Sequence, residues 1–228
     1  MRNLFFAPVV LTLVALALGP SALAQQQPAQ AFWSDNWNDV CHSFTDLDGD
    51  GSFTGAGEVE FHVDPLSPAG ESTTALQVTV ENGQPVTYWV KVSTDTIYRG
   101  VDANHDGTLA GAEIAVFRNS GALDGNSWPQ DLEVTADGAV WWTSGLVLSQ
   151  PLNGLSRLQD LNSDGDAADP GESVLMVDGN EPFFVEHDLG STAISGWYLQ
   201  DLAAAGNGVI AVSALDGATY RFEDKNGD

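Results

Sequence analysis

Short apolar segments separated by turn residues recur along most of the chain. Segments 86–92, 139–142 and 209–212 are apolar and rich in β-branched or aromatic residues, and each begins shortly after an Asn-Gly or Asp-Gly pair. Such pairs favour the tight turn of a β-hairpin when apolar segments flank them. The pattern therefore predicts antiparallel strands over most of the chain.

One N-terminal segment has helical spacing instead. Apolar residues at this spacing follow a capping residue, Ser34 or Asp35, and they are Trp37, Val40, Cys41 and Phe44. We therefore expect one short helix over residues 34–44. The preceding residues 25–33 begin with a low-complexity polar stretch and are assigned to a polar linker.

An acidic segment occurs four times and divides the chain into repeats. The copies have Asp, Asp or Asn, and Asp at alternate positions, and they begin at Asp46, Asp102, Asp160 and Asp224. In the first three copies a Gly follows the third of these residues, and a Glu follows 11 or 12 residues after the first Asp, at Glu58, Glu113 and Glu172. An Arg stands three residues before the first Asp of the last three copies, at Arg99, Arg157 and Arg221. The copy at Asp224 lacks the Gly turn and the Glu, so we expect it to be weak or empty as a site.

Each repeat reads as strand, turn, strand, connection, strand, acidic loop and strand. A four-stranded sheet of about 60 residues cannot bury both faces until a neighbour stacks on it. The sequence therefore predicts an all-β, propeller-like array of four-stranded antiparallel blades, about three units and a fragment, with a β-sandwich as the alternative. Aromatic residues of the second strands, among them Tyr88, Trp89, Trp141 and Trp142, are expected between the sheets. Because the fourth repeat is incomplete, three arrangements are open. The free sheet edge favours self-association, the first and last half-blades pair to close a ring, or the chain is truncated.

Composition and charge narrow the classes of partner. Hydrophobic residues make up 43% of the chain and charged residues 17%, which is typical of a folded protein. Seven Lys and Arg against 32 Asp and Glu give a net charge of −25. Such a field repels nucleic acids and anionic membranes, so cations are the expected counter-ligands.

The N-terminus predicts export. Residues 1–24 have a charged start, an apolar stretch and a small-residue exit, which is typical of a signal peptide cleaved after Ala24. We therefore expect a secreted or periplasmic protein without a membrane anchor, whose repeat domain covers residues 34–228. Cys41 is the only cysteine, so rigidity has to come from something other than an internal disulfide.

The acidic loops have the ligand spacing of calcium sites. Oxygen ligands at positions 1, 3, 5 and 7, a Gly at position 6 and a Glu near position 12 enclose one Ca²⁺ in an EF-hand loop. The second loop matches this pattern throughout, whereas the first and third contain one extra residue before the Glu. The predicted ligands are Asp46, Asp48, Asp50, Ser52 and Glu58; Asp102, Asn104, Asp106, Thr108 and Glu113; and Asp160, Asn162, Asp164, Asp166 and Glu172.

The residues flanking the loops favour strands, unlike the helices that flank a true EF-hand. The chain resembles secreted bacterial propeller-repeat proteins with EF-hand-like calcium loops, and its layout is similar to the FG-GAP repeats of integrin-type propellers. The resemblance covers roughly residues 40–228. It implies that calcium is structural and that a ligand, such as an extracellular protein or a glycan, binds at the blade loops.

No sequence motif for catalysis is evident. The chain contains no G-x-S-x-G, H-E-x-x-H, S-x-x-K or P-loop motif. The predicted function is therefore that of a secreted calcium-binding repeat protein with a structural or extracellular interaction role. The alternative is a calcium-dependent carbohydrate-active enzyme, a lyase or glycosidase, because a catalytic carboxylate pair is not visible in one sequence.

Overall fold

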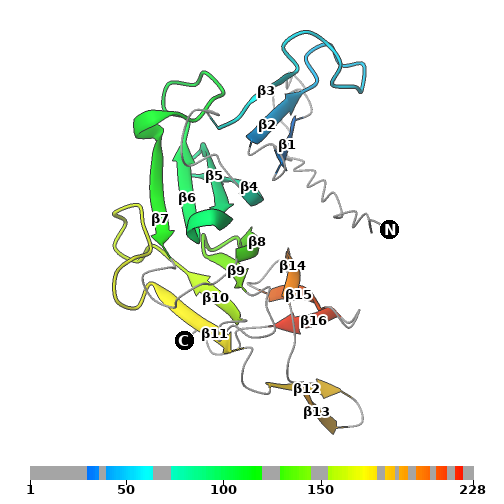
Figure 1. Cartoon of the computed structure of the whole chain (residues 1–228), viewed down its shortest axis with the longest axis vertical. Coiled ribbons are helices and arrows are strands. Elements are labelled where there is room, and N and C mark those ends of the chain that lie inside the picture. The colour runs from blue at the N-terminus through cyan, green and yellow to red at the C-terminus, as the bar shows by residue number, and fades with distance from the viewer. Residues whose placement is uncertain are drawn as a thin grey trace, which may run out of the picture.

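The computed structural model describes residues 30–35, 40–63, 73–119, 129–144, 154–178, 183–187, 190–194, 199–205, 209–214 and 219–222. The predicted signal peptide and the acidic copy at Asp224 lie outside these residues. The regular elements of the described chain are strands, apart from two short 3-10 turns, η1 (Val92–Thr94) and η2 (Gly111–Glu113). The predicted all-β class is confirmed (Figure 1).

The strands form successive antiparallel sheets in chain order, and we call the first three sheets units 1 to 3. Unit 1 has three strands, β1 (Gln30–Asp35), β2 (Val40–Thr45) and β3 (Val59–Phe61). Unit 2 has four strands, β4 (Thr73–Glu81), β5 (Gln84–Lys91), β6 (Thr96–Val101) and β7 (Ile114–Asn119). Unit 3 has the same order, with β8 (Pro129–Val134), β9 (Val140–Ser144), β10 (Gly154–Leu158) and β11 (Ser173–Asp178).

Two smaller sheets follow along the chain. One is a hairpin of β12 (Phe183–His187) and β13 (Gly190–Ile194). The other has three strands, β14 (Leu199–Ala205), β15 (Val209–Ala214) and β16 (Thr219–Phe222). The first strands of neighbouring sheets lie against one another, because β1 contacts β4, β4 contacts β8, and β8 contacts β14. The three- and four-stranded sheets therefore lie next to one another in chain order, whereas the β12–β13 hairpin, which comes between unit 3 and β14 along the chain, is not part of this series of contacts (Figure 1).

The repeat found in the sequence is also a structural repeat. The first strands β4, β8 and β14 each contain a register shift at the same repeat position, just before Leu76, Leu132 and Leu202 respectively. A second shift leaves Phe117 of β7 and Met176 of β11 as extra residues, and each lies four residues after the Glu of its acidic loop. A β-bulge adds one residue and bends its strand, so the two four-stranded sheets share the same local distortions.

The predicted helix over residues 34–44 is wrong. Two strands, β1 and β2, occupy the ends of this segment and pair antiparallel, with Ser34 opposite Cys41. Residues 30–33, which were assigned to the linker, also belong to β1. Cys41 is fully buried and packs with Val63, Trp89 and Leu109. Packing against these residues, which are distant in sequence, outweighs the local helical spacing.

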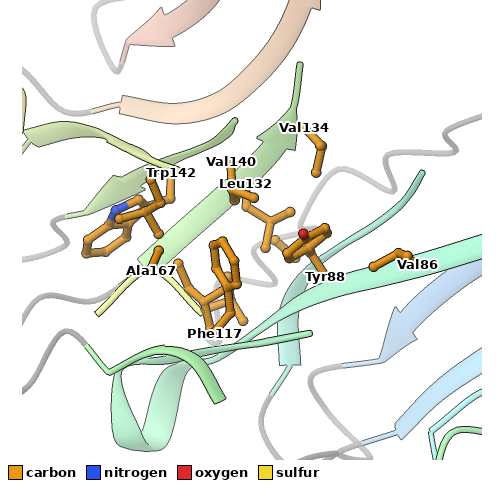
Figure 2. Packing of buried hydrophobic residues seen from close by; sticks show 12 residues of the cluster. Val86, Tyr88, Phe117, Leu132, Val134, Val140, Trp142 and Ala167 are labelled. Atoms are coloured by element: carbon orange, nitrogen blue, oxygen red, sulfur yellow. The ribbon is translucent and has the colours of Figure 1, made fainter. Parts of the chain in front are cut away.

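The largest apolar cluster lies between units 2 and 3. Tyr88, Phe117, Leu132, Val140 and Trp142 belong to it, and they come from strands of both units (Figure 2). Tyr88 and Phe117 meet edge to face with ring centroids 5.0 Å apart. Tyr88, Trp89, Trp141 and Trp142 are all buried, as expected of aromatic residues between stacked sheets.

A side chain at Gly100 is expected to destabilise the protein. A Cβ there would lie 2.5 Å from Leu109 Cδ1 and 2.9 Å from Trp89 Cζ3. We expect Gly100→Ala to lower the free energy of unfolding by about 1–3 kcal/mol, because both neighbours are buried and closely packed. Denaturant unfolding measures this loss. In a double-mutant cycle with Leu109→Ala the cost should shrink, and an equal cost in both backgrounds would contradict the clash.

Candidate metal centre

The first acidic loop, residues 46–58, connects β2 to β3 and is held by its own carboxylates. Asp46 Oδ2 accepts the backbone N–H of Gly51 at 3.1 Å. Asp48 accepts the N–H of Asp50 at 3.1 Å, and Asp50 accepts the N–H of Ser52 at 2.7 Å. The three acceptors stand at every second residue, and their carboxylates hold the backbone of the loop in a tight turn.

The other two loops repeat this arrangement. The second, residues 102–113, connects β6 to β7, and the third, residues 160–172, connects β10 to β11. Asp102 and Asp160 accept the N–H of Gly107 and Gly165 respectively, both at 2.9 Å. These glycines have φ angles of 87° and 98°, a left-handed conformation that residues with a Cβ rarely adopt. The Gly at position 6 is therefore required by the turn.

Among the described residues, three carboxylate oxygens come together in the first loop. Asp46, Asp48 and Asp50 each place one oxygen so that all three lie within 4.8 Å of one another. Asp46 is nearly buried, whereas the other two are exposed. Three oxygens at this separation can all contact one divalent cation, although exposed acidic clusters of this kind also occur without an ion.

Asn replaces the second acid in the second and third loops. Asn104 Nδ2 donates to Asp106 at 3.0 Å, and Asn162 Nδ2 donates to Asp164 at 3.1 Å. Asn162 also donates to Asp169 at 2.6 Å. Asn162 therefore links two carboxylates, whereas Asn104 binds one. In both loops the Asn carbonyl oxygen accepts the N–H two residues on, at 2.8 and 2.9 Å.

The predicted Glu ligands bind the backbone on both sides of their loops. Glu58 accepts the N–H of Leu47 at 3.0 Å through Oε1 and the N–H of Gly55 through Oε2. Glu58 and Glu172 are 2% and 3% exposed. The same backbone contacts recur in the other two loops. Glu113 accepts the N–H groups of Ala103, Asn104 and Ala110 at 3.0, 3.2 and 3.2 Å. Glu172 accepts the N–H groups of Leu161, Asn162 and Asp169 at 2.9, 3.3 and 3.0 Å.

This bonding restricts what each Glu can offer an ion. A carboxylate has about four lone-pair directions, two on each oxygen. Oε1 of Glu113 and Oε1 of Glu172 each accept two amides, so only Oε2 keeps a free lone pair. The loops as folded therefore offer at most one oxygen from each of these Glu residues, unlike the bidentate Glu of an EF-hand.

The extra residue of the first and third loops lies before the Glu contact. In every loop the Glu accepts the N–H of the residue three positions earlier, which is Gly55, Ala110 or Asp169. The final turn is therefore the same in all three loops, and the one-residue difference is absorbed between position 6 and that turn. The three-residue separation between each Glu and the N–H that it accepts is therefore the local feature that the three loops share.

No protein-family model, curated protein or solved structure shows a significant match to this chain. Among the residues that the structure describes, no helix is long and apolar enough to cross a membrane.

The repeated arginines bind the acids of the hairpin turns. Arg99 donates to Glu81 at 2.6 Å, and Arg157 donates to Asp137 at 3.2 Å. Tyr88 also donates to Glu81 at 2.6 Å, and burial, with the adjacent Glu81, raises the pKa of the Tyr88 hydroxyl. Arg99 and Arg157 thus pair with turn acids and not with the acids of the loops.

His62 is buried where unit 1 meets the second loop. Its Nε2 lies 2.8 Å from the hydroxyl of Thr87, and its Nδ1 has no hydrogen-bond partner among the described residues. Burial lowers the pKa of His62 to about 4, against smaller raising effects of the Gly107 backbone and the Asp102 charge. The imidazole is therefore neutral in the folded protein above about pH 4.

In calcium-free protein we expect the contribution of His62 to the free energy of unfolding to fall as the pH decreases from about 6.5 to about 4. In this window unfolded His62 binds a proton and folded His62 does not, so acid favours the unfolded state. The contribution of His62 to the free energy of unfolding is fully present above about pH 6.5 and is lost as the pH falls toward about 4. Denaturant unfolding of the wild type and His62→Gln measures it, and parallel pH curves for the two proteins would contradict the assignment.

Proposed function

We propose that this chain is a calcium-binding repeat protein in which Ca²⁺ stabilises the three acidic loops, with a structural or extracellular interaction role. The observation that carries the proposal is the shared geometry of the loops. In each loop the first Asp accepts the amide of the Gly at position 6, and in the first loop three carboxylate oxygens lie within 4.8 Å of one another.

The charge of the loops supports a cation as the ligand. Two like charges about 4 Å apart repel by about 1 kcal/mol even in bulk water. The arginines described above pair elsewhere, so they do not relieve this repulsion. A divalent ion would relieve it by contacting several carboxylates at once.

Calcium fits these loops better than magnesium does. Ca²⁺ accepts six to eight oxygens in irregular geometry, whereas Mg²⁺ requires near-ideal octahedral geometry at shorter distances. The loops differ in length and in the residue at position 3, and the Glu residues of the second and third loops have only one oxygen free to bind. An ion that tolerates irregular coordination is therefore the proposed occupant.

The proposed architecture and location follow the same reasoning. Contacts among the first strands of units 1 to 3 and of the β14–β16 sheet support a propeller-like array. The N-terminal residues have the pattern of a signal peptide. Extracellular calcium modules bind at about 10⁻⁴ to 10⁻³ M, which suits a secreted or periplasmic protein.

Calorimetric titration with Ca²⁺ and, separately, with Mg²⁺ tests the proposal. We expect calcium to bind at the three loops and magnesium to bind much more weakly. Asp50→Asn removes one loop charge while keeping an acceptor for the N–H of Ser52, and it should weaken one site at least about tenfold. Glu133→Gln removes a charge outside the loops and should leave binding unchanged. Equal binding of both metals, or no binding heat, would refute the proposal.

A further inference from the structure

Two acidic loops contact the preceding unit through their eighth residue. Leu109 is the eighth residue of the second loop, and Ala167 is the eighth residue of the third. The N–H of Leu109 donates to the carbonyl of His62 at 2.7 Å, and the N–H of Ala167 donates to the carbonyl of Phe117 at 2.8 Å. Both acceptors stand four residues after the Glu of the preceding loop. The same hydrogen bond therefore joins units 1 and 2 and units 2 and 3.

Side-chain packing reinforces the joint between units 1 and 2. Leu109 is 1% exposed and packs with Cys41 and Val63 of unit 1 and with Trp89 of unit 2. The backbone also forms a parallel bridge between Val63 and Leu109. Leu109 therefore binds unit 1 through both its main chain and its side chain.

The joint between units 2 and 3 uses a smaller residue and a second hydrogen bond. Ala167 is fully buried in the cluster that contains Phe117 (Figure 2). Its carbonyl accepts a hydrogen bond from Arg118 Nη1 at 3.0 Å, and Arg118 is 6% exposed. Both main-chain groups of Ala167 are thus bonded to β7 of the preceding unit.

We infer that the eighth residue of the second and third acidic loops is the joint between successive units, so that order in a loop is coupled to protection of the preceding unit. The Asp contacts close the loop before this residue, and the Glu contacts close it afterwards. A loop that opens can no longer hold its eighth residue against the neighbouring strand. The joint itself does not depend on the proposed function. If calcium binds the second loop as proposed, it protects unit 1 as well as unit 2, and only this part of the inference rests on the proposed function.

Hydrogen exchange of the full chain tests this coupling. Leu109→Ala should accelerate exchange in peptides from residues 40–63 about tenfold or more, while peptides from residues 154–178 keep their wild-type rates. Leu155→Ala makes the same deletion at a fully buried position in β10 of unit 3 and should give the reverse pattern. Equal acceleration in all units, or no change in residues 40–63, would overturn the inference.

Leu109→Val and a comparison with and without calcium separate the proposed joint from misfolding and from the calcium proposal. If Leu109→Ala does not fold, Leu109→Val should show the same selectivity with a smaller increase. If calorimetry shows calcium binding but a chelator leaves exchange in residues 40–63 unchanged, the coupling is refuted and the calcium proposal stands. If calcium does not bind, yet the Leu109 variants selectively expose residues 40–63, the joint stands and the calcium proposal fails.

Discussion

Removal of calcium by a chelator is expected to lower the free energy of unfolding by about 4 kcal/mol. Each site contributes about 1.4 kcal/mol when free calcium is tenfold above its dissociation constant, and three loops are proposed to bind. This is a large part of the roughly 5–15 kcal/mol that stabilises a typical domain. For a chain of this size the unfolding midpoint should fall by about 10 °C, which thermal unfolding monitored by circular dichroism measures.

Selectivity separates a specific ion from general screening of charge. Excess magnesium at the same ionic strength should restore only a small part of the lost stability, whereas calcium should restore all of it. The Asp50→Asn variant should lose about one quarter to one third of the calcium effect, because a tenfold or greater loss of affinity at one of the three loops removes about 1.0–1.4 kcal/mol. An unchanged midpoint after chelation, or full restoration by magnesium, would contradict the expected result.

Glu172→Ala should destabilise the calcium-free protein by about 3 kcal/mol. Glu172 is 3% exposed and accepts three backbone N–H groups, those of Leu161, Asn162 and Asp169. Its removal leaves three partly buried donors without their acceptor, and an unsatisfied buried donor costs about 1–3 kcal/mol. Denaturant unfolding in chelator measures the metal-independent part.

Two comparisons identify the hydrogen bonds as the cause. Glu172→Gln keeps one acceptor oxygen, so it should be less destabilising than Glu172→Ala. Glu60→Ala removes an exposed acid from β3 and should change stability by less than about 0.5 kcal/mol. A Glu172→Ala effect that vanishes in chelator would mean that this Glu acts only as a metal ligand.

Local turn chemistry made much of the fold predictable. The Asn82-Gly83 pair predicted a hairpin, and both residues have positive φ angles, 50° and 81°, between β4 and β5. The acidic loops likewise follow β2, β6 and β10 at their predicted places. In these segments the backbone conformation depends on a few adjacent residues, so one sequence contains the signal.

Contacts between distant residues could not be predicted in the same way. Cys41 has helical spacing with its neighbours, but its position is set by Val63, Trp89 and Leu109. The roles of Glu58 and Leu109 depend on which backbone groups face them after folding. The spacing placed Glu58 near its loop without showing that it would accept the amides of Leu47 and Gly55.

Anomalous X-ray diffraction from crystals of the calcium-loaded protein shows whether the acidic loops hold the ion. We expect one calcium peak in each of the three loops, about 2.3–2.6 Å from the oxygens at positions 1, 3 and 5. In the second and third loops the Glu should contribute no more than one oxygen. The absence of calcium from all three loops would refute the proposed role of the ion.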